Sequence, residues 1–150
     1  SSYIGYDISE NAINRAIKIS EEKKYHDKAK FFSKSILETP ILDADYVFSL
    51  GLTDWLNDDE LDHLFKISKN SENIHSISEN KQSFSQLLHK IYVFLSYARK
   101  TKGYAPRYLD SKKIAGLITK YTGKKVFAYR NKKMSFGILL TTLPLDKTSF

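Results

Sequence analysis

The chain alternates between short apolar runs and longer stretches in which apolar residues recur every three or four positions. Residues 3–8 form the first short run and predict a buried strand. A helix-period apolar face then continues to about Lys24, which predicts a helix. Ser9 stands where its hydroxyl can cap this helix, and Glu10 lies in the first turn, where the helix dipole favours an acid. The opening of the chain therefore predicts a strand that passes directly into a capped helix.

The same alternation continues to the end of the sequence. Further strands are expected at residues 29–32, 45–50 and 73–78, and two final β-rich runs at Lys125–Arg130 and Ser135–Thr142. Further helices are expected from Asn57, from Phe84 to about Arg99, and from Asp110 or Ser111 to the glycine cap at Gly123.

Asn57 and Glu60 have the spacing of a capping box. Asn131–Lys133 is expected to join the last two strands as a hairpin connection. The order β-α-β-β-α-β-α-α-β-β predicts an α/β fold with a Rossmann-like, doubly wound, mostly parallel sheet and a C-terminal antiparallel hairpin. No internal repeat or second domain is visible, so residues 1–150 are expected to form one domain.

Composition narrows the chemistry. The 150 residues carry a net charge of +7 and no cysteine, which excludes disulfides, zinc-thiolate sites and cysteine nucleophiles and fits a cytoplasmic protein. The charge allows an anionic partner such as nucleic acid, but the lysines are spread along the chain, so a solvated surface is the preferred interpretation. No apolar run is long enough to span a membrane, and the four histidines lack metal-ligand spacing, so neither a membrane nor a metal is expected.

Three segments together resemble class I S-adenosylmethionine-dependent methyltransferases. Gly5–Ser9 resembles the end of that family's second strand, and residues 44–61 resemble its fourth strand and the helix after it. Residues 106–126 resemble its final helix and the approach to its antiparallel hairpin. The resemblance covers nearly the whole chain and lies in the order and spacing of these segments rather than in one specific motif.

One element of that family is absent from this sequence. The first strand and its glycine-rich turn have no counterpart, since only Ser1 and Ser2 precede the strand that resembles the second. In the family's fold the first strand lies between the second and the fourth. We therefore expect the chain to be the C-terminal two-thirds of a methyltransferase-like domain lacking its first strand, with two half-sheets and exposed edges. By itself it should bind cofactor weakly or not at all, or need a swapped partner chain to complete its sheet.

The resemblance implies a set of cofactor-binding residues. Asp7 would accept hydrogen bonds from the ribose hydroxyls of S-adenosylmethionine, with Ile8 against the adenine face and Ser33 near the adenine. Ser49 and Leu50 would line the mouth where methyl transfer occurs. The alternatives are a capping acid at Asp7, a core residue at Ile8 and an ordinary loop serine at Ser33.

A candidate catalytic residue comes from the next strand. His75, together with Glu79, is expected around the end of that strand and near an acceptor, where an imidazole could act as general base for an O-methyl acceptor. The alternative is a loop histidine without a catalytic role. Two other histidines, His26 and His89, have no evident partner in the sequence.

The sequence thus predicts an enzyme, an S-adenosylmethionine-dependent methyltransferase acting on a small molecule or a glycan. An RNA or tRNA methyltransferase is an alternative that the net charge suggests. A non-catalytic, methyltransferase-like assembly subunit is another, suggested by the absent glycine-rich turn. A Rossmann dehydrogenase fits the terminal hairpin less well. The acceptor and the oligomeric state are not determined by the sequence.

Overall fold

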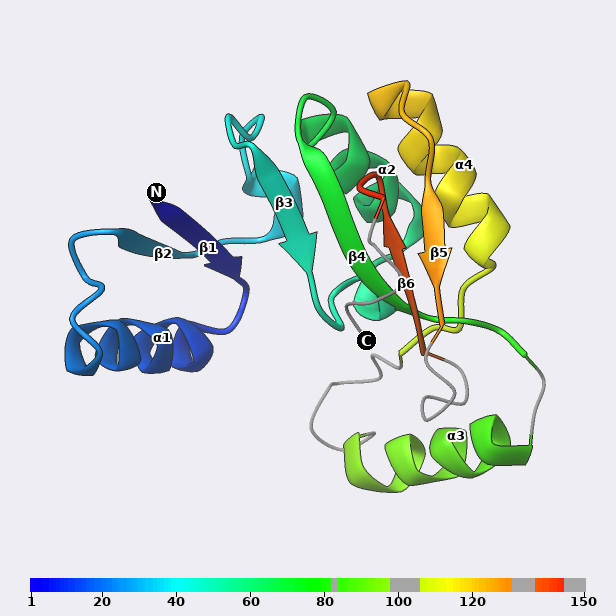
Figure 1. Ribbon diagram of the computed structural model, residues 1–150. Coiled ribbons are helices and arrows are strands. Elements are labelled where there is room, and N and C mark those ends of the chain that lie inside the picture. Colours follow the sequence, from blue (N-terminus) through cyan, green and yellow to red (C-terminus); the bar gives the residue numbers. More distant parts are fainter. Residues whose placement is uncertain (82–83, 98–105, 131–136, 145–150) are drawn as a thin grey trace. The chain divides into compact units, whose positions relative to one another are not determined.

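The computed structural model describes residues 1–81, 84–97, 106–130 and 137–144 (Figure 1). The chain divides into two compact units, Ser1–Ile41 and Leu42–Phe150. Each unit has its own sheet, and each is described separately below. The expectation of one domain for residues 1–150 stays a prediction.

The first unit is a β-α-β unit. Strand β1 (Tyr3–Asp7) leads into helix α1 (Glu10–Glu22), which returns the chain to strand β2 (Ala29–Ser33); the short 3-10 helix η1 (Ile36–Glu38) follows. β1 and β2 are parallel and in register from Tyr3 opposite Ala29 to Asp7 opposite Ser33. The hydroxyl of Ser9 accepts the backbone N–H of Ala12, which confirms the predicted helix cap.

The second unit holds a four-stranded mixed sheet in the order β3-β4-β6-β5. Its elements are β3 (Tyr46–Ser49), the 3-10 helix η2 (Thr53–Trp55), α2 (Asp58–Ile67), β4 (Glu72–Ser78), α3 (Phe84–Tyr97), α4 (Ser111–Thr122), β5 (Phe127–Tyr129) and β6 (Gly137–Thr141). β3 and β4 are parallel, and β6 is antiparallel to β4 and β5. The predicted order of elements and the terminal antiparallel pair are confirmed. The expected helix end at Arg99 and the expected hairpin connection at Asn131–Lys133 lie outside the described residues.

The core of this unit lies on one face of the sheet. Alternate residues of β4 point to that face, and Ile77, like Leu140 of β6, is almost fully buried there. Helices α2 and α4 lie on the same side of the sheet (Figure 1) and contribute Phe65 and Ile118, both 0% exposed. At full burial each such side chain stabilises the fold by roughly 1.5–3 kcal/mol.

Strands β1 and β3 each lie at the edge of a sheet. Among the described residues, β1 pairs with β2 alone and β3 pairs with β4 alone. On the resemblance, β1 corresponds to the second strand of the methyltransferase fold and β3 to the fourth. The strands are therefore divided into two sheets at the position expected for the first strand, as the sequence predicted.

Candidate functional site

Asp7 and Ser33 lie side by side at the carboxyl edge of the first sheet. They are the last residues of two parallel strands and occupy opposite positions in the register. The carboxylate Oδ1 of Asp7 accepts the backbone N–H of Ser9 at 2.7 Å. Both side chains are exposed, so a ligand at this edge can reach them. Open α/β sheets bind their ligands at the carboxyl ends of parallel strands.

Ile8 lies at the same edge. Its side chain is 78% exposed, which rules out the alternative of a core residue among the described parts of the chain. A large exposed aliphatic side chain beside a carboxylate offers an apolar surface on which a flat ring can pack. Three of the five predicted cofactor residues are therefore gathered at one edge of the first unit.

Ser49 is the last residue of β3, and Leu50 follows it. The two side chains differ in exposure. Leu50 is 73% exposed, whereas Ser49 is 7% exposed. The hydroxyl of Ser49 lies 2.9 Å from Nδ1 of His75, its register partner on β4. Ser49 therefore faces the core, and Leu50 alone of this pair is displayed at the carboxyl end of β3. Their role at a cofactor stays a prediction.

His75 stands in the body of β4, and this corrects the expectation that it lies around the end of its strand. The side chain is 0% exposed and packs edge-on against Phe65, with ring centroids 5.3 Å apart. Its Nε2 lies 2.9 Å from Oδ1 of Asn73. Both ring nitrogens are thus engaged inside the core.

The hydrogen-bond network around His75 determines its tautomer. The amide nitrogen of Asn73 donates to the carbonyls of Ser68 and Ser71, so its Oδ1 must be the acceptor. Nε2 of His75 therefore carries the hydrogen, and Nδ1 accepts the hydroxyl of Ser49. Burial lowers the pKa of His75 from 6.5 to about 4, which keeps the ring neutral.

A general base must lie within hydrogen-bond reach of the proton that it removes. His75 is enclosed by Ser49, Asn73 and Phe65, and none of its surface is exposed. His75 as the base stays a prediction, and its burial favours a structural role, namely holding the end of β3 against β4.

A titratable cluster that the sequence did not predict lies at the carboxyl edge of the second sheet. Asp54, in η2 just after β3, accepts both the backbone N–H and the hydroxyl of Ser78, the last residue of β4, at 2.8 Å each. Burial raises the pKa of Asp54, although its hydrogen bonds to Ser78 and the nearby His89 act in the opposite direction. The carboxylate is therefore fixed where β3 and β4 end.

Tyr108 and His89 complete this cluster. The segment before α4 runs beside the end of β4, because Leu109 donates its N–H to the carbonyl of Ser78 at 2.8 Å. Nδ1 of His89, on α3, lies 2.7 Å from the hydroxyl of Tyr108, and the ammonium of Lys90 lies 5.0 Å from the tyrosine ring centroid. Burial first, and then the charge of Asp54, raise the pKa of Tyr108.

The sequence offered no partner for His89, and the structure supplies one. Its partner is 19 positions away and comes close only through tertiary packing. The one local signal in the sequence was Gly51, which stands directly after a predicted strand and three residues before Asp54. Its φ of 74° is left-handed, as in a turn. Such a turn places the next residues at the carboxyl edge of the sheet.

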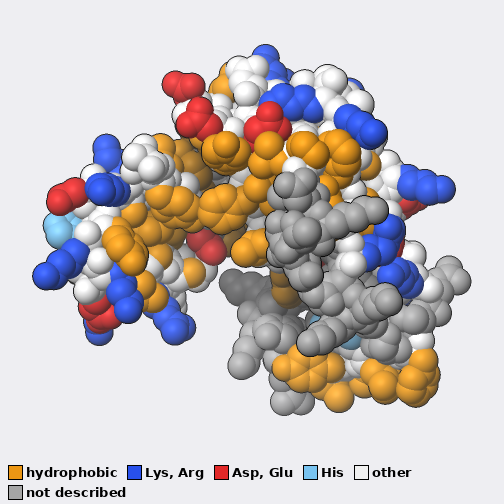
Figure 2. All heavy atoms as spheres, viewed as in Figure 1, with side chains coloured by type: hydrophobic (Ala, Val, Ile, Leu, Met, Phe, Trp, Pro, Cys, Tyr) orange, Lys and Arg blue, Asp and Glu red, His pale blue; other side chains and the backbone are white. Residues whose placement is uncertain are grey.

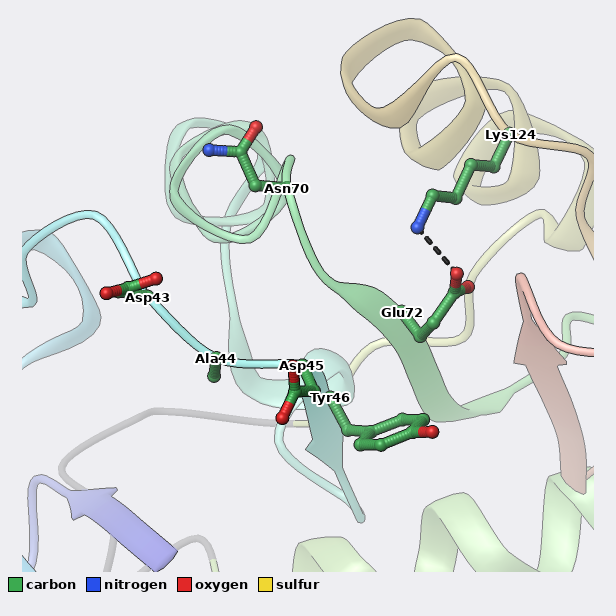
Figure 3. Close-up of a pocket in the computed structure, with 7 residues that line it drawn as sticks. All are labelled: Asp43, Ala44, Asp45, Tyr46, Asn70, Glu72 and Lys124. Atoms are coloured by element: carbon green, nitrogen blue, oxygen red, sulfur yellow. Dashed lines mark hydrogen bonds and ion pairs between the residues drawn. The ribbon is translucent and has the colours of Figure 1, made fainter. Parts of the chain in front are cut away.

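A polar pocket of the second unit lies at the opposite edge of this sheet (Figure 3). It has a volume of about 480 Å³ and is lined by Asp43, Ala44, Asp45, Tyr46, Asn70, Glu72 and Lys124. Tyr46 and Glu72 are the first residues of β3 and β4. Glu72 is already paired with Lys124 at 2.6 Å, and Figure 3 shows Asp43 and Asp45 directed away from that pair. The pocket thus lies at the amino ends of the parallel strands, where open α/β sheets do not bind their ligands.

Comparison with known proteins gives a fold but no close relative. No family model matches the chain, and no curated protein matches it. Magnesium protoporphyrin IX methyltransferase from Synechocystis, solved with bound S-adenosylhomocysteine, is similar with a TM-score of 0.67 and 16% identity. An O-methyltransferase family protein from Burkholderia thailandensis has a TM-score of 0.65 and 14% identity. A family 2 O-methyltransferase from Planctomyces limnophilus, in complex with apigenin, has a TM-score of 0.67 and 11% identity.

The matches cover almost all of this chain but only part of the solved proteins. They include 94% of this chain and 63% of the Synechocystis enzyme, and 93% of this chain and 42% of each of the other two. Identities this low carry information about the fold alone. Together with the strand orders β1-β2 and β3-β4-β6-β5, they show that the chain has the fold of the class I S-adenosylmethionine-dependent methyltransferases.

Proposed function

We propose that this protein transfers the methyl group of S-adenosylmethionine to a small-molecule or glycan acceptor. The observation that carries the proposal is the exposed carboxylate of Asp7 at the carboxyl end of a parallel strand, beside Ser33. The fold supports it, since three similar structures are methyltransferases and one of them was solved with S-adenosylhomocysteine.

The residues at this edge suit the cofactor. A carboxylate has about four acceptor sites, and the Ser9 amide uses one of those of Asp7. The remaining acceptor sites of Asp7 can accept hydrogen bonds from the two hydroxyls of a ribose. The hydroxyl of Ser33 would bind near the adenine, and the exposed side chain of Ile8 would pack on its face. When bound, the cofactor supplies a methyl group on a positively charged sulfur.

We assign the removal of the acceptor's proton to residues of the second unit. An acceptor hydroxyl must lose its proton when its oxygen is methylated, and histidine is the side chain that most often removes such a proton. His89 is half-buried and not enclosed, unlike His75. The Tyr108 hydroxyl lies 2.7 Å from Nδ1 of His89 and so orients the imidazole ring. The carboxylate of Asp54 is fixed nearby by its two hydrogen bonds to Ser78. We therefore assign the general base to His89, with Tyr108 and Asp54 as positioning residues.

Cofactor binding is tested by calorimetry with S-adenosylhomocysteine on the full natural protein. Hydrogen bonds to a charged group contribute about 1.5–3 kcal/mol, so Asp7→Ala should weaken binding roughly 10- to 100-fold. Asp27→Ala is the matched control, because Asp27 is an exposed acid just before β2, at the opposite edge of the same sheet. No heat with the unaltered protein, or equal losses in both variants, would refute the assignment.

Methyl transfer is tested with radiolabelled S-adenosylmethionine and a panel of phenols, carboxylic acids and oligosaccharides. For any acceptor that is methylated, His89→Gln should lower kcat roughly 100-fold or more, whereas His26→Gln, a change on the exposed loop of the first unit, should not. Cofactor binding with no turnover on any acceptor would favour the non-catalytic alternative. Salt-dependent retention on RNA would favour the RNA alternative.

A further inference from the structure

Helix α3 buries a polar side chain and displays apolar ones. Gln86 is 1% exposed; its amide nitrogen donates to the carbonyl of Glu79 at 2.7 Å, and its amide oxygen accepts the backbone N–H of Lys81. His89 lies on the same side of the helix, where its Nδ1 is 2.7 Å from the hydroxyl of Tyr108. Surface helices of globular proteins ordinarily bury their apolar stripe, so α3 has the opposite arrangement.

The outward face of α3 carries an apolar stripe, which consists of six large side chains at helical spacing. Its members are Phe84 (75% exposed), Leu87 (53%), Leu88 (51%), Ile91 (48%), Tyr92 (59%) and Leu95 (73%). At 3.6 residues per turn, Gln86 lies about 180° around the helix from the middle of this stripe. Figure 2 shows hydrophobic side chains gathered along the position of α3.

The contacts of Gln86 and His89 fix the helix in this rotation. A rotation that turned the stripe inward would break both hydrogen bonds of the Gln86 amide and the contact between His89 and Tyr108. Hydrogen bonds lost inside a protein cost free energy. The stripe therefore stays outward, and a continuous exposed apolar surface of this kind marks an interaction site.

The stripe is large enough to hold two copies of the chain together. A buried aromatic side chain removes about 200 Å² from water, and a buried aliphatic one about 100 Å². Weighted by the exposed fractions, the six side chains expose roughly 500 Å² per copy. Two stripes packed together would bury roughly 1,000 Å², which is about the lower limit for a specific protein interface.

The order of the side chains makes the stripe complementary to itself. Reversing the direction of the helix about the middle of the stripe, between positions 89 and 90, exchanges the six residues in three pairs. These pairs are Phe84 with Leu95, Leu87 with Tyr92, and Leu88 with Ile91. Two antiparallel copies related by a twofold axis would therefore bring the members of each pair opposite one another, twice. In two of the pairs an aromatic ring meets a smaller aliphatic side chain, a combination that lets facing layers interdigitate.

Charge does not oppose such a pairing. Lys90 is the only Lys, Arg, Asp or Glu from Phe84 to Tyr97. Its ammonium lies 5.0 Å from the centroid of the Tyr108 ring, on the side of the helix away from the stripe. The contact would therefore bring no like charges together, and the stripe offers no charge that would select a different partner.

We propose that α3 is a dimerisation helix, which packs its stripe antiparallel against the same stripe of a second copy of this chain. The interface is isologous, with its twofold axis between positions 89 and 90. It uses the side of α3 opposite His89 and is independent of methyl transfer.

The dimer is tested by sedimentation equilibrium of the full chain over about 2–200 µM. An interface of this size should give a dissociation constant of about 1–100 µM. Leu88→Glu/Ile91→Glu should raise that constant roughly 100-fold or more, because the twofold axis brings four carboxylates together in an apolar contact. Leu37→Glu/Ile41→Glu is the matched control, because it makes the same change in charge at two exposed aliphatic residues of the first unit (53% and 63%). The control should change the constant less than about threefold, since charges farther than a Debye length from the interface are screened.

A second measurement tests the antiparallel arrangement and does not depend on the folding of the glutamate variant. The chain has no cysteine of its own, so single cysteines can be introduced at the two ends of the stripe. Phe84→Cys and Leu95→Cys should each form no disulfide under mild oxidation alone, because identical positions lie about 16 Å apart along the paired helices. An equimolar mixture of the two variants should form the mixed disulfide, because position 84 of one copy faces position 95 of the other.

Several results would overturn the proposal. A chain that stays monomeric at about 200 µM has no such interface. A dimer that Leu88→Glu/Ile91→Glu leaves intact, or that both glutamate variants weaken equally, is held by another surface, such as an open strand edge. Disulfides within either single-cysteine protein alone, or none in the mixture, exclude the antiparallel pairing. Among the described residues no helix is long and apolar enough to cross a membrane, but a dimer that dissociates when phosphatidylcholine vesicles are added would show that the stripe prefers a lipid surface.

Discussion

The buried histidine of β4 makes the stability of the second unit depend on pH. Burial lowers the pKa of His75 from 6.5 to about 4 in the folded state. Between these values the unfolded chain binds a proton that the folded chain does not, so the free energy of unfolding falls as pH falls. The gap multiplied by 1.36 kcal/mol per pKa unit gives a loss of about 3 kcal/mol, of which about 2 kcal/mol is lost by pH 5.

The assay is urea unfolding from pH 7.5 to 4.5, followed by the fluorescence of Trp55, the only tryptophan and a residue of the same unit. His75→Gln keeps a side chain that can donate and accept hydrogen bonds but cannot titrate. It should cost about 1–2 kcal/mol at pH 7.5 and lose most of the dependence on pH between 6.5 and 4.5.

His63→Gln is the control, because it removes a half-buried histidine from α2 in the same unit. It should leave the pH dependence in place. Asp54, whose pKa is raised by burial, opposes the effect as pH falls toward its own range, but it does so equally in all three proteins. If the free energies of unfolding of the wild type and His75→Gln fall equally as pH falls, the ring of His75 is not held neutral by burial. The hydrogen bonds assigned to it would then be incorrect.

Four further substitutions test the packing, the end of α4 and the charges. Ile118→Ala removes a side chain that is 0% exposed in the core between α4 and the sheet, and should cost about 2–5 kcal/mol in urea unfolding; a loss below 1 kcal/mol would contradict that core. Gly123→Ala, at the C-cap of α4, and Gly116→Ala, inside α4, are a matched pair that should change the free energy of unfolding in opposite directions. Gly123 has a φ of 68° and should lose about 1 kcal/mol. Gly116 lies inside the helix with nothing within 4 Å of an added Cβ and should gain about 0.5–1 kcal/mol; equal signs would refute the assigned helix end. The Arg130 guanidinium, first among several causes, lowers the pKa of Glu79 to about 2, so Glu79 stabilises the fold above about pH 4.5 and this contribution is lost as pH falls toward 2. Glu79→Gln should therefore lower the Tm more at pH 7 than at pH 2.5, and an equal change at both would show that the ion pair does not form.

Local rules of the sequence determined the elements and their order. Capping residues and helical periodicity correctly predicted both helix starts at Ser9 and Asn57, where Asn57 and Glu60 do form a capping box. The same rules placed Asp7 at the end of its strand. The sequence put Ser33 just after the next strand and the resemblance implied its place near the adenine, but the position of Ser33 opposite Asp7 comes from the strand register. These features depend on residues a few positions apart, or on one β-α-β connection, and so can be recognised along the chain.

Tertiary structure decided which polar residues are buried and which come together. In β4, period-two alternation puts His75 on the covered face of the sheet, and only the packing of α2 shows that this face excludes the ring from solvent. The carboxylate of Asp54, the imidazole of His89 and the hydroxyl of Tyr108 come from three separate elements and meet because the segment before α4 runs beside the end of β4. The apolar period of α3 predicted the helix but not the exposure of its apolar side chains, since the same period occurs on buried and on exposed helix faces. Burial depends on what packs against a residue from elsewhere in the chain, and for that reason the sequence pattern alone could not supply it.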